Sequence, residues 1–364
     1  MAVEAGTDLN MEIAGELYDL AFIHDSKHAR IAYRRAARAV VGLEVSLRDF
    51  VRDHAPREIP YVGPASERVI FEHLEQGKSL SVERAVEQSP RRSELETARS
   101  LRSDFLSRAE ALRILKAPAE GTVGLQDYRG DLQMHTEWSD GVESVAEMAS
   151  AAMARGYGFI GVSDHSYGLK IAGGVSMEDV RRQHIETDRL NRGWASTFRV
   201  IKGIEANIPA QGGVDMAPEE LAEFEIVLAA PHSKLRRLED QTDRMLATVR
   251  HPQVHVLAHP RGRMYTRRGV VARWPEVFQA AQEHDVAIEL DGDPYRQDLD
   301  HRTARLALDA GCLFALDSDA HSGSELRYVE FALAHARRAG IPASRVINTW
   351  PTDRLLDWAR RKMA

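Results

Sequence analysis

The sequence predicts an α/β fold, either a closed barrel or a doubly wound sheet, preceded by an all-helical region. From residue 129 onward, short apolar runs alternate with helical patterns, as buried parallel strands alternate with the helices that cover them. Before residue 117, apolar residues recur at helical spacing and strand-like alternation is absent. The seven apolar runs span residues 130–134, 159–162, 198–204, 226–230, 254–258, 286–290 and 312–316. Seven such units favour a TIM-like barrel or an open parallel sheet.

The first 116 residues are predicted to form a small helical domain. Four segments show helical spacing, namely 11–22, 31–41, 45–54 and 64–76. Gly77 supplies a stop for the last of them. The stretch 82–115 is rich in Glu, Arg, Ala and Leu, and we expect one or two more helices there. Residues 117–128 have the composition of a linker, so the predicted domains are 1–116 and 129–364.

Composition excludes several classes of protein. The 364 residues include 48 basic and 55 acidic side chains, and a net charge of −7 argues against gripping nucleic acid by bulk electrostatics, although a local basic groove remains compatible. A single cysteine, Cys312, excludes a disulfide framework and a cysteine-based zinc site. The sequence lacks a long apolar run and a basic signal-peptide start, so we expect a cytoplasmic protein without a membrane partner.

Potential metal ligands follow the apolar runs of the second region. In a parallel barrel these ends meet on one rim, where such folds keep their active sites. A lone histidine is usually an ordinary core or surface residue, but five of the fifteen close apolar runs, and chance placement of all five is improbable. The five are His135, His165, His232, His259 and His321. Imidazole and carboxylate together suit Zn²⁺, Mn²⁺ or Fe²⁺, and the number of donors implies more than one ion.

Four motifs resemble the polymerase and histidinol phosphatase (PHP) family of metal-dependent phosphoesterases. They span residues 130–141, 163–166, 258–263 and 319–322, and they are most similar to the PHP module at the C-terminus of bacterial family X DNA polymerases. The resemblance implies a distorted (βα)7 barrel that holds two to three divalent metal ions. Carried over by position, it assigns one metal to Gln133, His135, Glu205 and Asp319, a second to Glu205, His232 and His259, and a third to Asp140, His165 and His321.

One position departs from the family pattern. Much of the family has a histidine where this chain has Gln133. An amide oxygen is a weaker and harder donor than an imidazole, so the first metal is expected to bind loosely or to favour Mn²⁺ over Zn²⁺. The expected catalytic residues are His135, Glu205, Asp319 and His321.

The first region is similar to the N-terminal helical domain of family X polymerases, which contains a helix-hairpin-helix. Segments 32–38 and 59–78 carry this resemblance. Tyr61 replaces the first glycine of the hairpin turn, and Val69 stands where lyase members have their Schiff-base lysine, so lyase activity is not expected. The candidate DNA contacts are Arg34, Arg35, Gly63 and Lys78, although an arginine-bearing helix face is often merely solvated. Too few residues separate the two regions for a polymerase palm, so the chain is not expected to polymerise DNA.

The predicted reaction is hydrolysis of a phosphate ester by a metal-activated hydroxide. DNA ends are the first candidate substrate, for a 3′–5′ exonuclease or 3′-phosphatase in DNA repair. A small-molecule phosphomonoesterase of histidinol-phosphatase type is the alternative, favoured by the acidic net charge, and a non-catalytic binding module is a third. Substrate phosphate is expected to contact Arg263 first, and then Arg267, Arg296 and Lys234. Asp131, Asp164 and Asp317 lie beside ligands and are expected either to orient imidazoles or to bond strand-end backbone.

Overall fold

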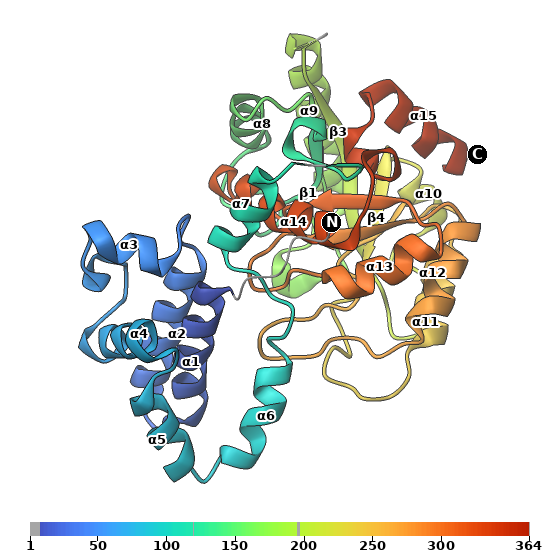
Figure 1. Cartoon of the computed structure of the whole chain (residues 1–364). Helices are drawn as coiled ribbons and strands as arrows, with labels where there is room; N and C mark the ends of the chain where they lie inside the picture. The colour runs from blue at the N-terminus through green and yellow to red at the C-terminus, as the bar shows by residue number, and fades with distance from the viewer. Residues whose placement is uncertain (1–7, 119, 195–196, 364) are drawn as a thin grey trace. The chain divides into compact units, whose positions relative to one another are not determined.

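The computed structural model describes residues 8–118, 120–194 and 197–363 (Figure 1). The chain divides into two compact units, one up to Ala117 and one from Pro118 onward. The segment 120–128, which we expected to be part of a linker, packs instead on the second unit. Val123 is fully buried, and its N–H donates to the carbonyl of Ile341 at 2.9 Å.

The described part of the first unit is helical. Its helices are α1 (Leu9–Ile23), α2 (Lys27–Val41), α3 (Leu47–Asp53), α4 (Pro64–Gln76), α5 (Leu80–Gln88), α6 (Arg92–Ser100) and α7 (Arg108–Lys116). Stretch 82–115 thus contributes to three helices rather than one or two, because Pro90 cannot continue α5 and Ser107 caps the start of α7. Gly77 ends α4 with a φ of 74°, as predicted.

The second unit is a barrel of parallel strands in sequential order (Figure 1). The strands are β1 (Gly130–Met134), β2 (Phe159–Val162), β3 (Arg199–Asn207), β4 (Ile226–Ala230), β5 (Val256–Leu257), β6 (Ala287–Asp291) and β7 (Phe314–Asp317). The connecting and flanking helices are α8 (Val145–Ala154), α9 (Met177–Trp194), α10 (Pro218–Leu221), α11 (Thr242–Val249), α12 (Trp274–Glu283), α13 (His301–Asp309), α14 (Val329–Ala339) and α15 (Thr352–Met363). The α/β, TIM-like fold class is confirmed.

Side chains complete the seam between β1 and β7. The Leu132 N–H donates to Oδ1 of Asp317 at 2.8 Å, and the Ser318 N–H donates to Asp131 at 3.2 Å. Asn348 donates both to Asp317 and to the carbonyl of Gly130. Because buried backbone groups need partners, these side chains replace ladder hydrogen bonds where the barrel is distorted. A parallel bridge from Met134 to Ala320 then brings the C-terminal ends of both strands together.

Candidate metal centre

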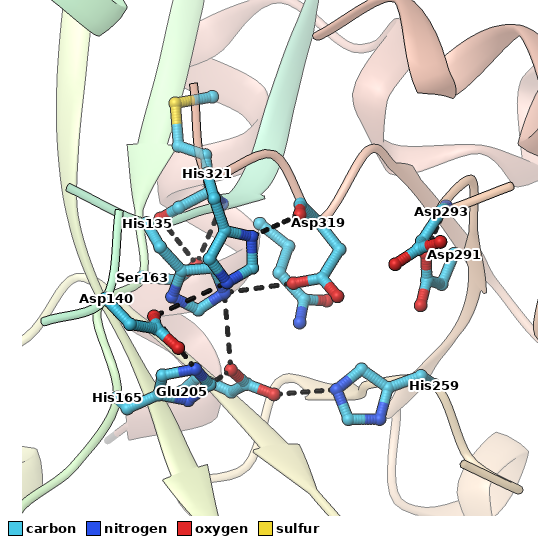
Figure 2. A network of polar contacts seen from close by, with 12 residues as sticks. His135, Asp140, Ser163, His165, Glu205, His259, Asp291, Asp293, Asp319 and His321 are labelled. Carbon is cyan, nitrogen blue, oxygen red and sulfur yellow. Dashed lines mark hydrogen bonds and ion pairs between the residues drawn. The ribbon is translucent and has the colours of Figure 1, made fainter. Parts of the chain in front are cut away.

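The C-terminal rim of the barrel brings the predicted ligands together. His135 follows β1, His165 follows β2, and Glu205 lies near the C-terminal end of β3. His232 and His259 follow β4 and β5, and Asp319 and His321 follow β7. Two groups have the spacing of a metal site: His135, Asp140, His165 and His321 form the first, and His165, Glu205 and His232 the second. Figure 2 shows Glu205 at the centre of this network.

Glu205 contacts four imidazoles, two through each carboxylate oxygen. Its Oε2 lies 2.8 Å from His165 Nδ1 and 3.5 Å from His135 Nε2. Its Oε1 lies 2.8 Å from His259 Nε2 and 3.4 Å from His232 Nε2. The buried carboxylate of Glu205 therefore lies between two pairs of histidines, one pair at each oxygen. This is the arrangement expected of a carboxylate shared by two cations.

Asp140 gathers the remaining imidazoles. Its Oδ1 lies 3.4 Å from Nε2 of both His165 and His321. The rings of His135 and His165 stack with centroids 4.2 Å apart, and Nδ1 of His321 lies 2.9 Å from the backbone oxygen of Asp319. Asp140 is the more exposed member, so this group opens toward solvent while Glu205 closes the inner end.

Asp319 links the histidines to a buried arginine. Its Oδ1 lies 3.0 Å from Nε2 of His135, and its Oδ2 lies 3.1 Å from Nη1 of Arg296. Arg296 also reaches Oδ2 of Asp291 at 3.3 Å. Burial alone would raise the pKa of Asp319, but Arg296 and His135 outweigh it and hold this pKa well below its usual range. Arg296 is therefore neutralised by carboxylates of β6 and of the loop after β7.

Gln133 provides the clearest indication that the donors fit cations. Its side chain is fully buried, and neither amide atom has a hydrogen-bond partner among the described residues. Burying an amide without a partner costs free energy unless a bound group interacts with it. The donor set around Gln133, of imidazoles and carboxylates, is the set that binds divalent transition metals. These residues therefore fit a metal centre.

Electrostatics favour ligand-competent protonation states at several positions. Burial opposes ionisation of Glu205, but His165 and His232 hold its pKa well below the ordinary value. Burial and the charge of Arg296 lower the pKa of His259 to about 4, so its imidazole is neutral at pH 7. Burial would also lower the pKa of His321, but Asp140 and Asp319 raise it to about 10. Cation binding there would displace a proton.

Two predicted ligands have a strained backbone. His259 has a φ of 25° and Asp319 a φ of 53°, in the region that side chains other than glycine rarely adopt. His259 follows β5 and points toward Glu205, and Asp319 follows β7 and points toward His135 (Figure 2). Strain of this kind clusters at functional sites, where the surrounding structure holds it.

The four candidate substrate contacts have different partners in the structure. Arg263, our first candidate, is buried and pairs with Asp300 at 2.9 Å. Arg296 contacts a predicted ligand but is neutralised. Arg267 is half-buried and donates to the carbonyl of Gly262, and Lys234 donates to that of Ala210.

Two positioning residues were missed in the sequence. Oδ1 of Asn207 lies 3.3 Å from Nδ1 of His232, and its spacing of two from Glu205 on one strand could have revealed it. Arg244 is buried and donates to the carbonyls of Ile208 and Pro209 on one loop and of Ser233 on the next. It thereby joins the loop after β3 to the loop after β4, which carries His232.

Within the described residues, the hydrogen bonds of the three aspartates beside predicted ligands go to groups other than imidazoles. Asp131 and Asp317 bond the barrel seam. Asp164 accepts hydrogen bonds from the N–H and hydroxyl of Thr136 and from the hydroxyl of Ser139. Asp164 thus fixes the loop after β1 that carries Asp140, and the strand-end interpretation holds over the imidazole-orienting one.

The four candidate DNA contacts of the first unit do not form one cluster. Arg34 and Arg35 are exposed on α2, and Gly63 is the N-cap of α4. Lys78 lies beyond the other end of α4, roughly 20 Å from Gly63 by helix length, and pairs with Glu83 at 2.9 Å. Tyr61 has a φ of 66°, so the turn keeps the left-handed backbone that a glycine would supply.

Comparisons with known proteins agree with these observations. The chain is 33% identical over 228 residues to the DNA polymerase/3′-5′ exonuclease PolX of Bacillus subtilis, covering 62% of this chain but only 40% of that polymerase. It is 29% identical over 250 residues to a probable phosphatase of Edwardsiella ictaluri, covering 65% of this chain and 95% of the phosphatase. No family model matches the chain.

The PHP resemblance is confirmed. A further relative is the probable phosphatase YcdX of Escherichia coli, 26% identical over 64% of this chain and 94% of the relative. The predicted enzyme class, a PHP-type hydrolase of phosphate esters, agrees with these relatives. The solved histidinol phosphate phosphatase of Lactococcus lactis, complexed with zinc, L-histidinol and phosphate, aligns with a TM-score of 0.46 and 15% identity over 59% of this chain and 94% of that one. No described helix is long and apolar enough to cross a membrane.

Proposed function

We propose that this PHP-type hydrolase holds two to three divalent ions (Zn²⁺, Mn²⁺ or Fe²⁺) and cleaves phosphate esters at DNA ends, as a 3′–5′ exonuclease or 3′-phosphatase. The observation that carries the proposal is the placement of Glu205 between two pairs of imidazoles. The similarity to a polymerase with 3′-5′ exonuclease activity supports DNA as the substrate.

We assign the ligands to the ions as the sequence predicts. Gln133, His135, Glu205 and Asp319 would hold the first ion, Glu205, His232 and His259 the second, and Asp140, His165 and His321 the third. When bound, such ions supply Lewis acidity and an activated water. The chain itself orients these donors: Arg296 fixes Asp319, and Asn207 fixes His232. In the overall hydrolysis a water oxygen bonds to phosphorus, the ester P–O bond breaks, and the leaving oxygen takes up a proton.

The first unit is proposed to contact nucleic acid. Helix α2 carries five Lys or Arg side chains and no carboxylate, although residues 1–120 have 18 basic against 20 acidic side chains. The exposed Tyr61 lies beside this face, with the Arg35 guanidinium 5.4 Å from its ring centroid. A basic helix face next to an exposed ring suits phosphates and a stacked base. Arg34, Arg35 and Gly63 remain in this proposal, and Lys78 does not.

The second candidate function is hydrolysis of a small phosphomonoester. The probable phosphatases favour it, because the chain matches 94–95% of their length. The net charge of −7 is also easier to reconcile with a small substrate than with bulk attraction to DNA.

One experiment separates these functions. The full chain with Mn²⁺ is given a 3′-labelled DNA primer and, separately, a panel of small phosphate esters. We expect release of 3′ nucleotides or 3′ phosphate that His259→Ala abolishes and His284→Ala, at the exposed histidine directly after α12, preserves. Turnover of small esters alone would replace the first proposal with the second. Absence of turnover with Mn²⁺, Zn²⁺ and Fe²⁺ would contradict both.

A further inference from the structure

Three arginines lie on adjacent loops at the C-terminal rim of the barrel. Arg236 belongs to the loop after β4, Arg267 to the loop after β5, and Arg296 to the loop after β6. These strands are neighbours in the barrel. Nη1 of Arg236 donates to the carbonyl of Thr266 at 3.2 Å, which joins the first loop to the second directly beside Arg267. Arg296 is the member that contacts the metal ligands, through Asp319.

Charge compensation distinguishes these arginines. Arg296 lies between Asp291 and Asp319, so its charge is already matched. In the described chain, by contrast, no carboxylate lies within ion-pair distance of Arg236 or Arg267. Nearby Arg261 and Arg263 show that the same loop readily forms ion pairs, because both contact Asp300.

Arg267 is held in place by a backbone hydrogen bond rather than by a carboxylate. It is half-buried, and its Nε donates to the carbonyl of Gly262 at 2.8 Å, which fixes the side chain without neutralising it. Burial and the neighbouring charges of Arg296 and Arg236 lower the pKa of Arg267 to about 10, and Asp298 offsets this only in part. Holding like charges together in a half-buried position is unfavourable unless an anion joins them.

We propose that Arg236 and Arg267 form a second anion subsite, which takes the phosphate adjacent to the scissile one on a nucleic acid strand. The inference rests on the proposed function and narrows its substrate to one with at least two phosphates. Neither arginine has a predicted metal ligand among its observed partners, so the bound anion lies beside the metal centre rather than on it. A phosphomonoester would leave this subsite unused, whereas a DNA strand would fill it.

The test compares substrates that differ by one phosphate. Wild-type protein with Mn²⁺ is assayed on thymidine dinucleotide, which has one phosphate, and on the trinucleotide, which has two. We expect kcat/KM to be higher for the trinucleotide. Arg267→Gln and Arg236→Gln should reduce trinucleotide kcat/KM by roughly tenfold to a hundredfold, the effect of one charge-assisted hydrogen bond, and leave the dinucleotide unchanged. Equal loss on both substrates, or no loss on either, would overturn the proposal.

A matched control lies on the same loop. Arg237 is adjacent to Arg236, is exposed, and lies 3.9 Å from Glu239. Arg237→Gln removes the same charge and should leave trinucleotide hydrolysis unchanged. A loss equal to that of Arg236→Gln would mean that net loop charge, not a subsite, is responsible.

A binding measurement separates this inference from the proposed function. Metal-free protein is titrated with inorganic phosphate by calorimetry, and the Arg267→Gln variant is titrated in parallel. If wild-type protein cleaves neither nucleotide, the DNA-end function fails, but phosphate binding that Arg267→Gln abolishes still supports the subsite. Equal phosphate binding by both proteins would contradict it whatever the activity.

Discussion

Nε2 of His259 lies 2.8 Å from Oε1 of Glu205, although the two residues come from different strands and are 54 positions apart. His259 follows β5, and its left-handed backbone directs the ring across the rim toward β3. The pairing places a neutral imidazole against an ionised carboxylate, because the pKa values of both groups are lowered. Two groups in these states share a cation more readily than a proton.

Glu205→Gln is expected to remove metal binding at the centre. The substitution keeps the shape of the side chain but removes the charge that both pairs of imidazoles surround. Metal content of the purified protein should fall by at least one ion per chain, as measured by elemental mass spectrometry. Addition of Mn²⁺ should raise the melting temperature of the wild type, by an amount equivalent to about 2.7 kcal/mol at a hundredfold excess over Kd, and should affect the variant much less.

Glu239→Gln is the control for that experiment. Glu239 is an exposed carboxylate of the same unit, and its substitution should leave metal content and the Mn²⁺-induced shift unchanged. If the Glu205→Gln variant contained as much metal as the wild type, Glu205 would not be a ligand shared by two ions.

Gln133→His is expected to tighten binding of the first metal ion. Gln133 is fully buried with an unpaired amide, and an imidazole is the stronger donor toward Zn²⁺. Competition against a chelator should show higher Zn²⁺ affinity in the variant, and the Zn²⁺ preference over Mn²⁺ should rise. Unchanged stoichiometry and affinity would show that position 133 is not a ligand.

The strands and the gathering of ligands could be predicted because both leave local patterns. Buried parallel strands appear as apolar runs, and β1, β2 and β4 have the predicted bounds. The extension of β3 to Asn207 was missed because Glu205 interrupts the apolar pattern, and that polar residue is the centre of the site. Ligands that follow successive strands must meet on one rim, so their convergence followed from the fold.

The partners of the arginines could not be predicted from the sequence. The His259-Pro-Arg-Gly-Arg263 segment suggested a phosphate contact, but Arg263 pairs with Asp300, 37 residues away on another loop. Similarly, Asp131 and Asp317 accept hydrogen bonds from backbone N–H groups where β1 and β7 meet, because the closure of the barrel is distorted there. No local sequence pattern indicates this distortion. Pairings of this kind depend on tertiary packing rather than on residue type.

Tyr61→Gly is expected to separate stability from nucleic acid binding. A left-handed residue with a side chain costs about 1–2 kcal/mol, and the greater unfolded-state freedom of glycine offsets roughly 0.5–1 kcal/mol of the relief. Stability should therefore stay the same or rise by up to about 1.5 kcal/mol. Affinity for single-stranded DNA should fall, because the exposed ring beside Arg35 is lost.

Urea denaturation and fluorescence anisotropy of a labelled oligonucleotide measure the two effects. Tyr61→Phe keeps the ring and should retain the affinity. Full affinity in Tyr61→Gly would contradict a contact between this turn and nucleic acid.

His73 is expected to make packing of α4 on α1 dependent on pH. Its imidazole is buried, with Nδ1 3.1 Å from Glu16 and Nε2 3.4 Å from Glu12. The close contact with Glu16 is the largest influence on the His73 pKa, and it raises that pKa above 6.5 against the effect of burial. Because the folded state binds this proton more tightly, the stabilisation is fully present below pH 6.5 and is lost as pH rises through the higher folded pKa.

Hydrogen exchange of the full chain, corrected for intrinsic rates, measures the effect in α1 and α4. Protection of both helices should decrease from pH 6 to pH 8 in the wild type, and His73→Gln should remove most of this dependence because glutamine does not titrate. His54→Gln is the matched control, since His54 also lies 3.0 Å from a glutamate but is exposed, where such a pair contributes little. If His73→Gln keeps the pH dependence of the wild type, another group is responsible and the His73 ion pairs do not control this packing.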